Sequence, residues 1–94
     1  MAPYDTVEEY TRKREGYVEH VRIRRTNDDK YPSGWDYTLH YGTTDGDTLL
    51  RYDNAHERTK GHEHHEGDDV EEVEFRGMSE LLARFQREVD DLPP

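Results

Sequence analysis

The chain contains no cysteine and no long apolar run. Without cysteine it can form neither a disulfide framework nor a metal site built on thiolates. A membrane span needs roughly 20 apolar residues in a row, and no stretch of the sequence approaches that length. The beginning of the chain, MAPYDTVEEY, has neither the basic nor the apolar region of a signal peptide. The sequence therefore predicts a cytoplasmic protein that has no contact with a membrane.

Apolar residues are also scarce, because they make up only 30% of the 94 positions. Globular domains usually contain more, and a domain of this size buries only roughly 60–65% of the surface that its unfolded chain exposes. Seven tyrosines, two phenylalanines and one tryptophan compensate in part, since each large ring buries much area. We expect a single domain over residues 1–94, and a homodimer or a partner chain would enlarge its thin core.

Positive charge is in deficit, because 23 Asp and Glu stand against 13 Lys and Arg, which gives a net charge of −10 with neutral histidines. High charge with low hydropathy is typical of disorder, but the apolar residues fall at regular spacings, which favours a folded chain. We interpret the acidity as adaptation to a high-salt cytoplasm, where salt screens the self-repulsion of an acidic surface. An acidic functional surface is the alternative. Neither interpretation excludes nucleic acid as a ligand, because an acidic protein can keep a local basic face.

Strand periodicity dominates the first two thirds of the chain. Trp35–Thr43 is the clearest strand, because large apolar side chains alternate there with polar ones, and Asp45-Gly46 is a strong signal for a hairpin turn. The predicted strands are Tyr17–Thr26, Trp35–Thr43, Thr48–Asn54 and Val70–Arg76. A capping pattern at Asp5 predicts a short N-terminal helix that ends before Gly16, with a strand as the alternative.

The last segment predicts an amphipathic helix that Ser79 caps. Its apolar residues recur with helical spacing; they are Leu81, Leu82, Phe85, Val89 and Leu92. Residues Ala55–Asp69 are expected to form a polar connection. Consecutive strands joined by tight turns pair antiparallel, and the terminal helix must cover the aromatic face of the sheet. The predicted fold class is therefore α+β, with an antiparallel sheet of about four strands packed by a C-terminal helix.

Histidine is concentrated between Leu49 and His65, a segment that holds four of the six histidines. Three interpretations remain open. His62 and His64 share one face of an extended segment and could bind Zn, Ni or Cu, although no fixed zinc spacing is matched. His56, His64 and His65 could instead donate and accept protons. The third interpretation is a solvated loop without chemistry, and we predict no cofactor.

Basic side chains and imidazoles also recur on one face of the predicted sheet. Arg51 and Asp53 share a face of their strand, where Arg51 can hold a phosphate bidentately and Asp53 can orient a histidine. Asn54 follows and is predicted to bind substrate, although Asn at a strand end often forms a cap or a turn. The residues that would extend this basic face are His20, Arg22, Arg24 and His40, of which Arg22 and His40 are predicted to bind substrate. The alternative is a set of scattered cations that balance carboxylates.

Four segments together resemble the TumE-like family: WDYTLHYG, LLRYDNAH, the histidine-rich GHEHH and the closing MSELLARFQREV. The resemblance covers the chain from Tyr17 to Leu92, and its most specific part is RYDNAH (Arg51–His56) followed by His64 and His65. Members of this family are small proteins described as toxins of type II toxin–antitoxin systems, with many haloarchaeal relatives. The resemblance therefore implies a haloarchaeal toxin whose partner is a cognate antitoxin. It carries over no catalytic residues.

These features lead to one functional hypothesis and one alternative. The hypothesis is a toxin that binds or cleaves RNA as a metal-independent endoribonuclease. In it His56, His64 and His65 transfer protons, Arg51 holds a phosphate and Asp53 orients a histidine. The alternative is a non-enzymatic module of a halophile that binds a partner protein or a metal ion.

Overall fold

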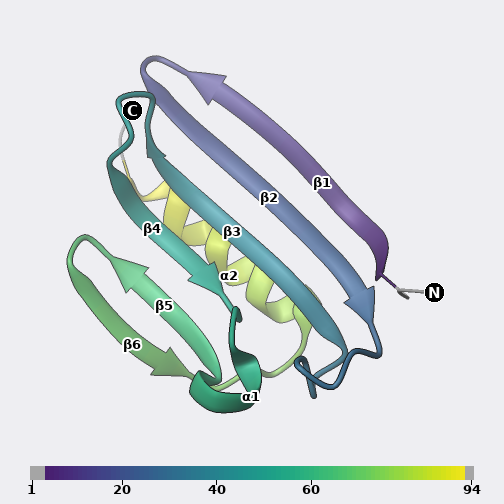
Figure 1. The fold of residues 1–94 in the computed structure, drawn as a ribbon. Helices are drawn as coiled ribbons and strands as arrows, with labels where there is room; N and C mark the ends of the chain where they lie inside the picture. The colour runs from purple at the N-terminus through teal and green to yellow at the C-terminus, as the bar shows by residue number, and fades with distance from the viewer. Residues whose placement is uncertain (1–3, 93–94) are drawn as a thin grey trace.

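One antiparallel sheet forms the architecture, and a helix packs on one of its faces (Figure 1). The computed structural model describes residues 4–92. The strands are β1 (Tyr4–Arg14), β2 (Tyr17–Thr26), β3 (Trp35–Thr43), β4 (Thr48–Asp53), β5 (His62–Glu66) and β6 (Asp69–Val73). They lie in the order β1-β2-β3-β4-β5-β6, so each strand pairs with its neighbour in sequence. The helices of the described residues are α1 (Glu57–Lys60) and α2 (Met78–Asp90). The α+β class is confirmed, but the sheet has six strands rather than the predicted four.

The first additional strand is β1, and it occupies the segment that the sequence predicts as a helix, Asp5–Glu15. The predicted helix is wrong, because β1 pairs with β2 along its whole length, and the strand given as the alternative is confirmed. Glu15 and Gly16 both have a positive φ, 51° and 86°, as the two central residues of a type I′ hairpin turn require. A helix here would bury little, since Val7 and Tyr10 are the apolar residues of the segment. The backbone of β1 finds its partners on β2 instead.

The second additional strand, β5, lies inside Ala55–Asp69, which the sequence predicts as a polar connection. That prediction is also wrong, because β5 pairs antiparallel with β4 on one side and with β6 on the other. Its sequence, HEHHE, contains no aliphatic residue, and its successive side chains point to opposite faces of the sheet, as in any strand. His62 and His64 point to the helix side of the sheet, whereas Glu63 and His65 point to the other side.

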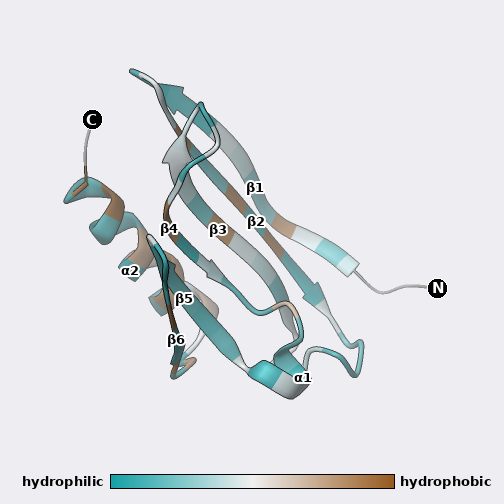
Figure 2. Ribbon diagram, turned by 60° about the vertical axis from the view of Figure 1, so that its left-hand side comes forward, coloured by the Kyte–Doolittle hydropathy of each residue, from teal (hydrophilic) through white to brown (hydrophobic). Residues whose placement is uncertain are grey.

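The core lies between α2 and the aromatic face of the sheet, where α2 follows the middle strands (Figures 1 and 2). Its buried apolar residues are Val21, Ile23, Tyr37, Leu39, Tyr41, Leu50, Tyr52, Met78, Leu81, Phe85 and Val89. Phe85 is fully buried and meets Tyr52 edge to face, with 6.4 Å between ring centroids. The prediction that the terminal helix covers the aromatic face is therefore confirmed. Truncation of such a buried ring typically costs about 3–5 kcal/mol.

Several element boundaries differ from the sequence prediction. Ser79 does not cap α2, because Gly77 occupies the N-cap position. The last strand ends at Val73, earlier than the predicted Arg76. Phe75 lies beyond this strand but still packs against the core.

The opposite face of the sheet carries polar side chains, and among residues 4–92 no helix packs on it (Figure 2). We call this surface the open face. Its charged and polar residues on β2 to β5 include His20, Arg22, Arg24, Asp36, Thr38, His40, Arg51, Asp53, Glu63 and His65. The cations and imidazoles that the sequence assigns to one face do share it.

Candidate functional site

A row of cations and imidazoles crosses the open face. In the strand register His20 lies opposite His40, His40 lies opposite Arg51, and Arg51 lies opposite His65. Cross-strand partners point to the same side of a sheet. Because neighbouring strands are roughly 4.8 Å apart, the row extends over about 14 Å. Arg51 therefore has an imidazole on each side.

A second row lies beside the first and carries the carboxylates. Arg22 lies opposite Thr38, Thr38 opposite Asp53, and Asp53 opposite Glu63. Asp53 and Glu63 are thus like charges in directly opposed positions, an arrangement that destabilises a sheet when nothing offsets it. The cations of the first row are close enough to offset part of this repulsion.

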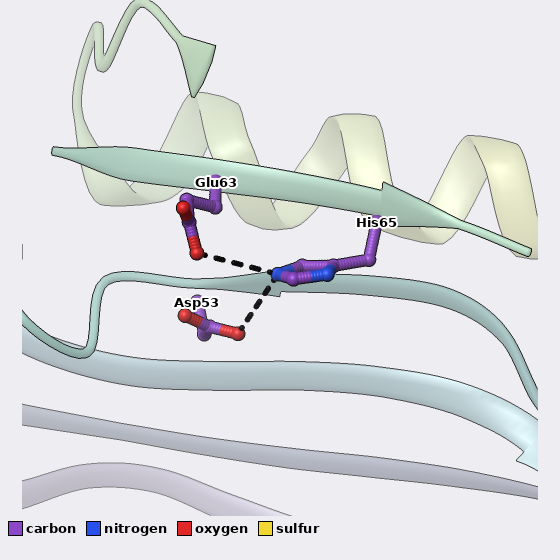
Figure 3. Close-up of side chains that lie close together, drawn as sticks. All are labelled: Asp53, Glu63 and His65. Carbon is purple, nitrogen blue, oxygen red and sulfur yellow. Dashed lines mark ion pairs between the residues drawn. The ribbon is translucent and has the colours of Figure 1, made fainter. Parts of the chain in front are cut away.

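Arg51, Asp53, Glu63 and His65 converge where the two rows meet, and we call this group the Asp53 cluster. Arg51 Nε lies 2.8 Å from Asp53 Oδ2, and His65 Nε2 lies 3.5 Å from the same oxygen. His65 Nε2 is also 3.5 Å from Glu63 Oε1, so both carboxylates face one ring nitrogen (Figure 3). The side chain of Asp53 is 5% exposed, that of His65 24% and that of Arg51 43%. A buried carboxylate thus holds an imidazole and a guanidinium that both reach the surface.

His40 flanks Arg51 on the other side of the row. Its Nε2 lies 3.0 Å from Thr48 Oγ1. Burial lowers the pKa of His40, and the charges of Arg51 and His20 lower it further. His40 is therefore a neutral imidazole at neutral pH. His20 lies at the end of the row, and its Nδ1 is 2.8 Å from Thr11 Oγ1.

The two arginines of β2 that lie on the open face differ in their partners. Arg24 is paired with Asp36, and its guanidinium carbon lies 4.6 Å from the centroid of the Tyr4 ring. Arg22 forms no ion pair within the described chain, whereas the buried Nε atoms of Arg22 and Arg24 alike have no hydrogen-bond partner there. The charge of Arg22 is thus less neutralised than that of Arg24, which makes Arg22 the better anion-binding candidate.

Two predicted site histidines lie outside the Asp53 cluster. His64 is on the helix side of the sheet, where its ring centroid lies 4.8 Å from that of Tyr52. His56 is exposed at the start of α1, with a φ of 63° in the left-handed region. The structure therefore brings Arg51, Asp53 and His65 together, but not His56 or His64.

Asn54, predicted to bind substrate, is fully buried. Its side-chain amide forms hydrogen bonds within the protein. Its Oδ1 accepts a hydrogen bond from Tyr37 N at 3.1 Å. Its Nδ2 donates to Trp35 O and to Glu57 Oε2, both at 2.6 Å. Glu57 also accepts hydrogen bonds from the backbone N and the hydroxyl of Ser33, at 2.7 and 2.8 Å. This network ties β3 and β4 to α1, so Asn54 stabilises the fold rather than facing a ligand.

Sequence reasoning did not identify Glu63 or Glu57. The alternation in HEHHE places Glu63 on the same face as His65, and that signal becomes visible once the segment is taken as a strand. Glu57 gave no such signal, because a carboxylate in a polar segment is rarely buried.

One group of potential metal ligands converges among the described residues. It consists of Asp53, Glu63 and His65, whose ligand atoms all lie within 4.8 Å of one another. The predicted alternative pair, His62 and His64, is not part of this group. His62 Nδ1 lies 2.7 Å from the Tyr37 hydroxyl, so its imidazole belongs to the packed side of the sheet.

Comparison with known proteins gives one match. The sequence model of the family described as Toxin TumE matches residues 2–93, nearly the whole chain. No curated protein and no solved structure matches. Neither helix of the described chain combines the length and the apolar character needed to cross a membrane.

Proposed function

Because the chain belongs to the TumE family of toxins, we propose that it is the toxin of a type II toxin–antitoxin pair and that it acts on RNA at its open face. Its partner is then a cognate antitoxin, which a neighbouring reading frame would encode. A surface with a net charge of −10 repels a polyanion in general. The row of cations and imidazoles is a local exception, and it is there that we expect phosphate to bind.

The surroundings of Arg51 carry this proposal. A guanidinium that is 43% exposed lies between His40 and His65, one on each neighbouring strand. Its ion pair with Asp53 uses Nε, so the terminal amino groups are free to bind two oxygens of a phosphate. Imidazoles on both sides of a bound phosphate can take up and release protons.

Metal-independent RNA cleavage needs a base for the 2′-hydroxyl proton and an acid for the leaving 5′-oxygen. The 2′-oxygen bonds to phosphorus as the bond to the 5′-oxygen breaks. His40 is the better base, because burial and neighbouring cations lower its pKa and keep it neutral. His65 is then the donor. Asp53 and Glu63 both face its Nε2, which leaves Nδ1 for the substrate.

The predicted proton-transfer residues His56 and His64 take no part in this mechanism, whereas the predicted substrate-binding residue Arg22 does. His64 points to the helix side of the sheet and His56 lies beyond the end of β4, so neither can reach a phosphate held by Arg51. Arg22 lies in the second row, diagonal to His40. It can hold an adjoining phosphate of the same strand of RNA.

The test compares single variants in growth arrest and in cleavage of a fluorogenic RNA by purified protein. H65A and R51A are expected to abolish arrest, and H65A should lower the cleavage rate by about 10²–10⁴-fold, the range for a positioned acid or base. H56A is the matched control, because it removes an exposed histidine of the same segment and should keep wild-type activity. Thermal unfolding verifies that each variant is folded. Arrest that persists in H65A but disappears in H56A would contradict the proposal.

The partnership has its own test. The product of the adjacent small reading frame should bind the wild-type chain and relieve arrest when the two are expressed together. If the folded protein binds RNA but leaves it intact, the catalytic part of the proposal is wrong and the open face is a binding surface.

A further inference from the structure

We propose that Asp53, Glu63 and His65 bind one divalent transition-metal ion, with Zn²⁺ as the best fit. The ligands would be one oxygen of each carboxylate and Nε2 of His65, atoms that lie within 4.8 Å of one another. A set of one imidazole nitrogen and two carboxylate oxygens suits Zn²⁺, whereas Mg²⁺ prefers oxygen ligands alone. Both strands that supply these ligands are anchored in the sheet, β4 on its two neighbours and β5 on its two.

The distances in the cluster already approach those of a metal centre. Two ligands of a tetrahedral zinc ion, each about 2.05 Å from the metal, are roughly 3.3 Å apart. His65 Nε2 is 3.5 Å from Asp53 Oδ2 and 3.5 Å from Glu63 Oε1. To bring all three ligand atoms to the spacing of a zinc site, the side chain of Glu63 would have to rotate. It can do so because it is 22% exposed. All three ligands come from the sheet, so the fourth position points away from it and can hold water.

Two features of the Asp53 cluster favour a bound cation. His65 Nε2 is buried without a hydrogen-bond partner among the described residues, as is His64 Nε2, although such atoms nearly always have one. Asp53 and Glu63 lie directly opposite each other on β4 and β5, where like charges destabilise a sheet. A dication between the three side chains would satisfy the nitrogen and neutralise the opposed carboxylates.

The neighbouring histidine shows why the arrangement around His65 is suited to one ion. His64 also has two carboxylate neighbours, but they face different ring nitrogens. Glu71 lies 3.3 Å from its Nδ1, and Glu66 lies 3.8 Å from its Nε2. Because the two nitrogens of an imidazole point in different directions, a single ion cannot bind His64 and both carboxylates. In the Asp53 cluster both carboxylates face the same nitrogen.

The positive charge of Arg51 repels a metal ion in this cluster and lowers its affinity. Its Nε lies 2.8 Å from Asp53 Oδ2, the oxygen proposed as a ligand. Removal of the guanidinium in Arg51→Gln should therefore tighten metal binding. The expected gain is about tenfold, from the repulsion between a single and a double positive charge roughly 5 Å apart in a water-like medium.

The binding site stands independently of the proposed function, but one consequence rests on it. Zn²⁺ bound to Nε2 of His65 would replace the contact by which Asp53 orients this ring. The proton of the zinc-bound ring would then lie on Nδ1, and a neutral imidazole holds that proton too tightly to donate it to the leaving oxygen. Bound zinc is therefore expected to inhibit RNA cleavage.

Calorimetric titration of the chelator-treated full chain with ZnCl₂ tests the site. We expect one ion per chain, with much weaker binding of Mg²⁺. H65A and E63Q each remove a direct ligand and should weaken zinc binding by about 100-fold or more. Changes to residues that only support a ligand typically cost about 10- to 100-fold, and loss of the ligand itself should cost at least as much. H64Q is the matched control and should leave the affinity unchanged. Absence of zinc binding by the wild-type chain, or equal losses in H64Q and H65A, would overturn the proposal.

Thermal unfolding separates the metal site from a merely structural role. Glu63→Gln should raise the unfolding temperature of the metal-free chain, because it removes the like charge opposite Asp53, and it should abolish the further rise that zinc produces. Arg51→Gln keeps the two proposals distinguishable, since it should stop growth arrest but tighten zinc binding. A zinc-induced rise that persists in E63Q would count against the metal site.

Discussion

Replacement of Asn54 by alanine distinguishes a structural asparagine from one that binds substrate. Asn54 is fully buried, and its amide makes three hydrogen bonds. Alanine removes all three and leaves Tyr37 N and Trp35 O without this partner in the interior. Glu57 loses one donor but keeps the two from Ser33.

The expected loss of stability follows from these contacts. A buried hydrogen bond contributes about 1 kcal/mol net, and a group left unsatisfied costs about 1–3 kcal/mol. With Tyr37 N and Trp35 O each at the lower end of that range and one hydrogen bond to Glu57 lost, the sum is about 3–4 kcal/mol. This is less than the roughly 5–15 kcal/mol by which such domains are stable. Asn54→Ala should therefore remain folded at 25 °C, with its urea midpoint lowered by about 2 M for an m-value of roughly 1–2 kcal/mol per M.

Urea unfolding followed by the fluorescence of Trp35, the one tryptophan of the chain, measures this shift. Without urea, Asn54→Ala should cleave RNA close to the wild-type rate. Asn54→Asp should destabilise more strongly, because a carboxylate would replace a donor that lies 2.6 Å from Glu57 Oε2. An unchanged midpoint combined with lost cleavage would show instead that Asn54 binds substrate and does not stabilise the fold.

Three further predictions concern stability. Burial, Arg51 and His20 lower the pKa of His40 in the folded chain, so the unfolded chain binds more protons and stability should fall as the pH drops below about 6.5. Thermal unfolding should show a smaller fall in H40N. The Tyr52 hydroxyl donates to Glu88 Oε1 at 2.6 Å, so Tyr52→Phe should lower the free energy of unfolding by about 1–2 kcal/mol in urea titrations and leave RNA cleavage intact. Molar KCl should raise the unfolding temperature, because salt screens a net charge of −10, and an unchanged temperature would contradict the halophilic interpretation.

Local alternation was sufficient to predict β2, β3 and β4 and the side on which their residues lie. Arg51 and Asp53 fall on one face and Tyr52 on the other, as predicted, because a period of two is a property of the strand itself. The Asp45-Gly46 turn followed from the same local chemistry, since Gly46 has a φ of 105° that other residues rarely adopt.

The two strands that the sequence assigned first to a helix and to a connection, β1 and β5, contain few of the apolar residues by which strands are recognised. In β5 the inward positions are His62 and His64, whose rings pack like apolar side chains. The ring centroid of His62 lies 4.3 Å from that of Phe75, and that of His64 lies 4.8 Å from that of Tyr52. Packing with distant residues, which no local pattern contains, makes this segment a strand.

The composition of the site depends on register. The sequence predicts His64 and His65 as a pair, but adjacent residues of a strand point to opposite faces. His65 meets Asp53 because it lies opposite Arg51 in the pairing of β4 with β5. A slip by one residue would exchange the two histidines, and tertiary pairing rather than local sequence sets that register.

The central claim is that the function lies on the open face. Cleavage of RNA by purified H65A and H64Q tests it most directly, since the two variants change adjacent histidines on opposite sides of one strand. We expect H65A to lose cleavage and folded H64Q to keep it. Full cleavage by H65A with loss in folded H64Q would contradict it.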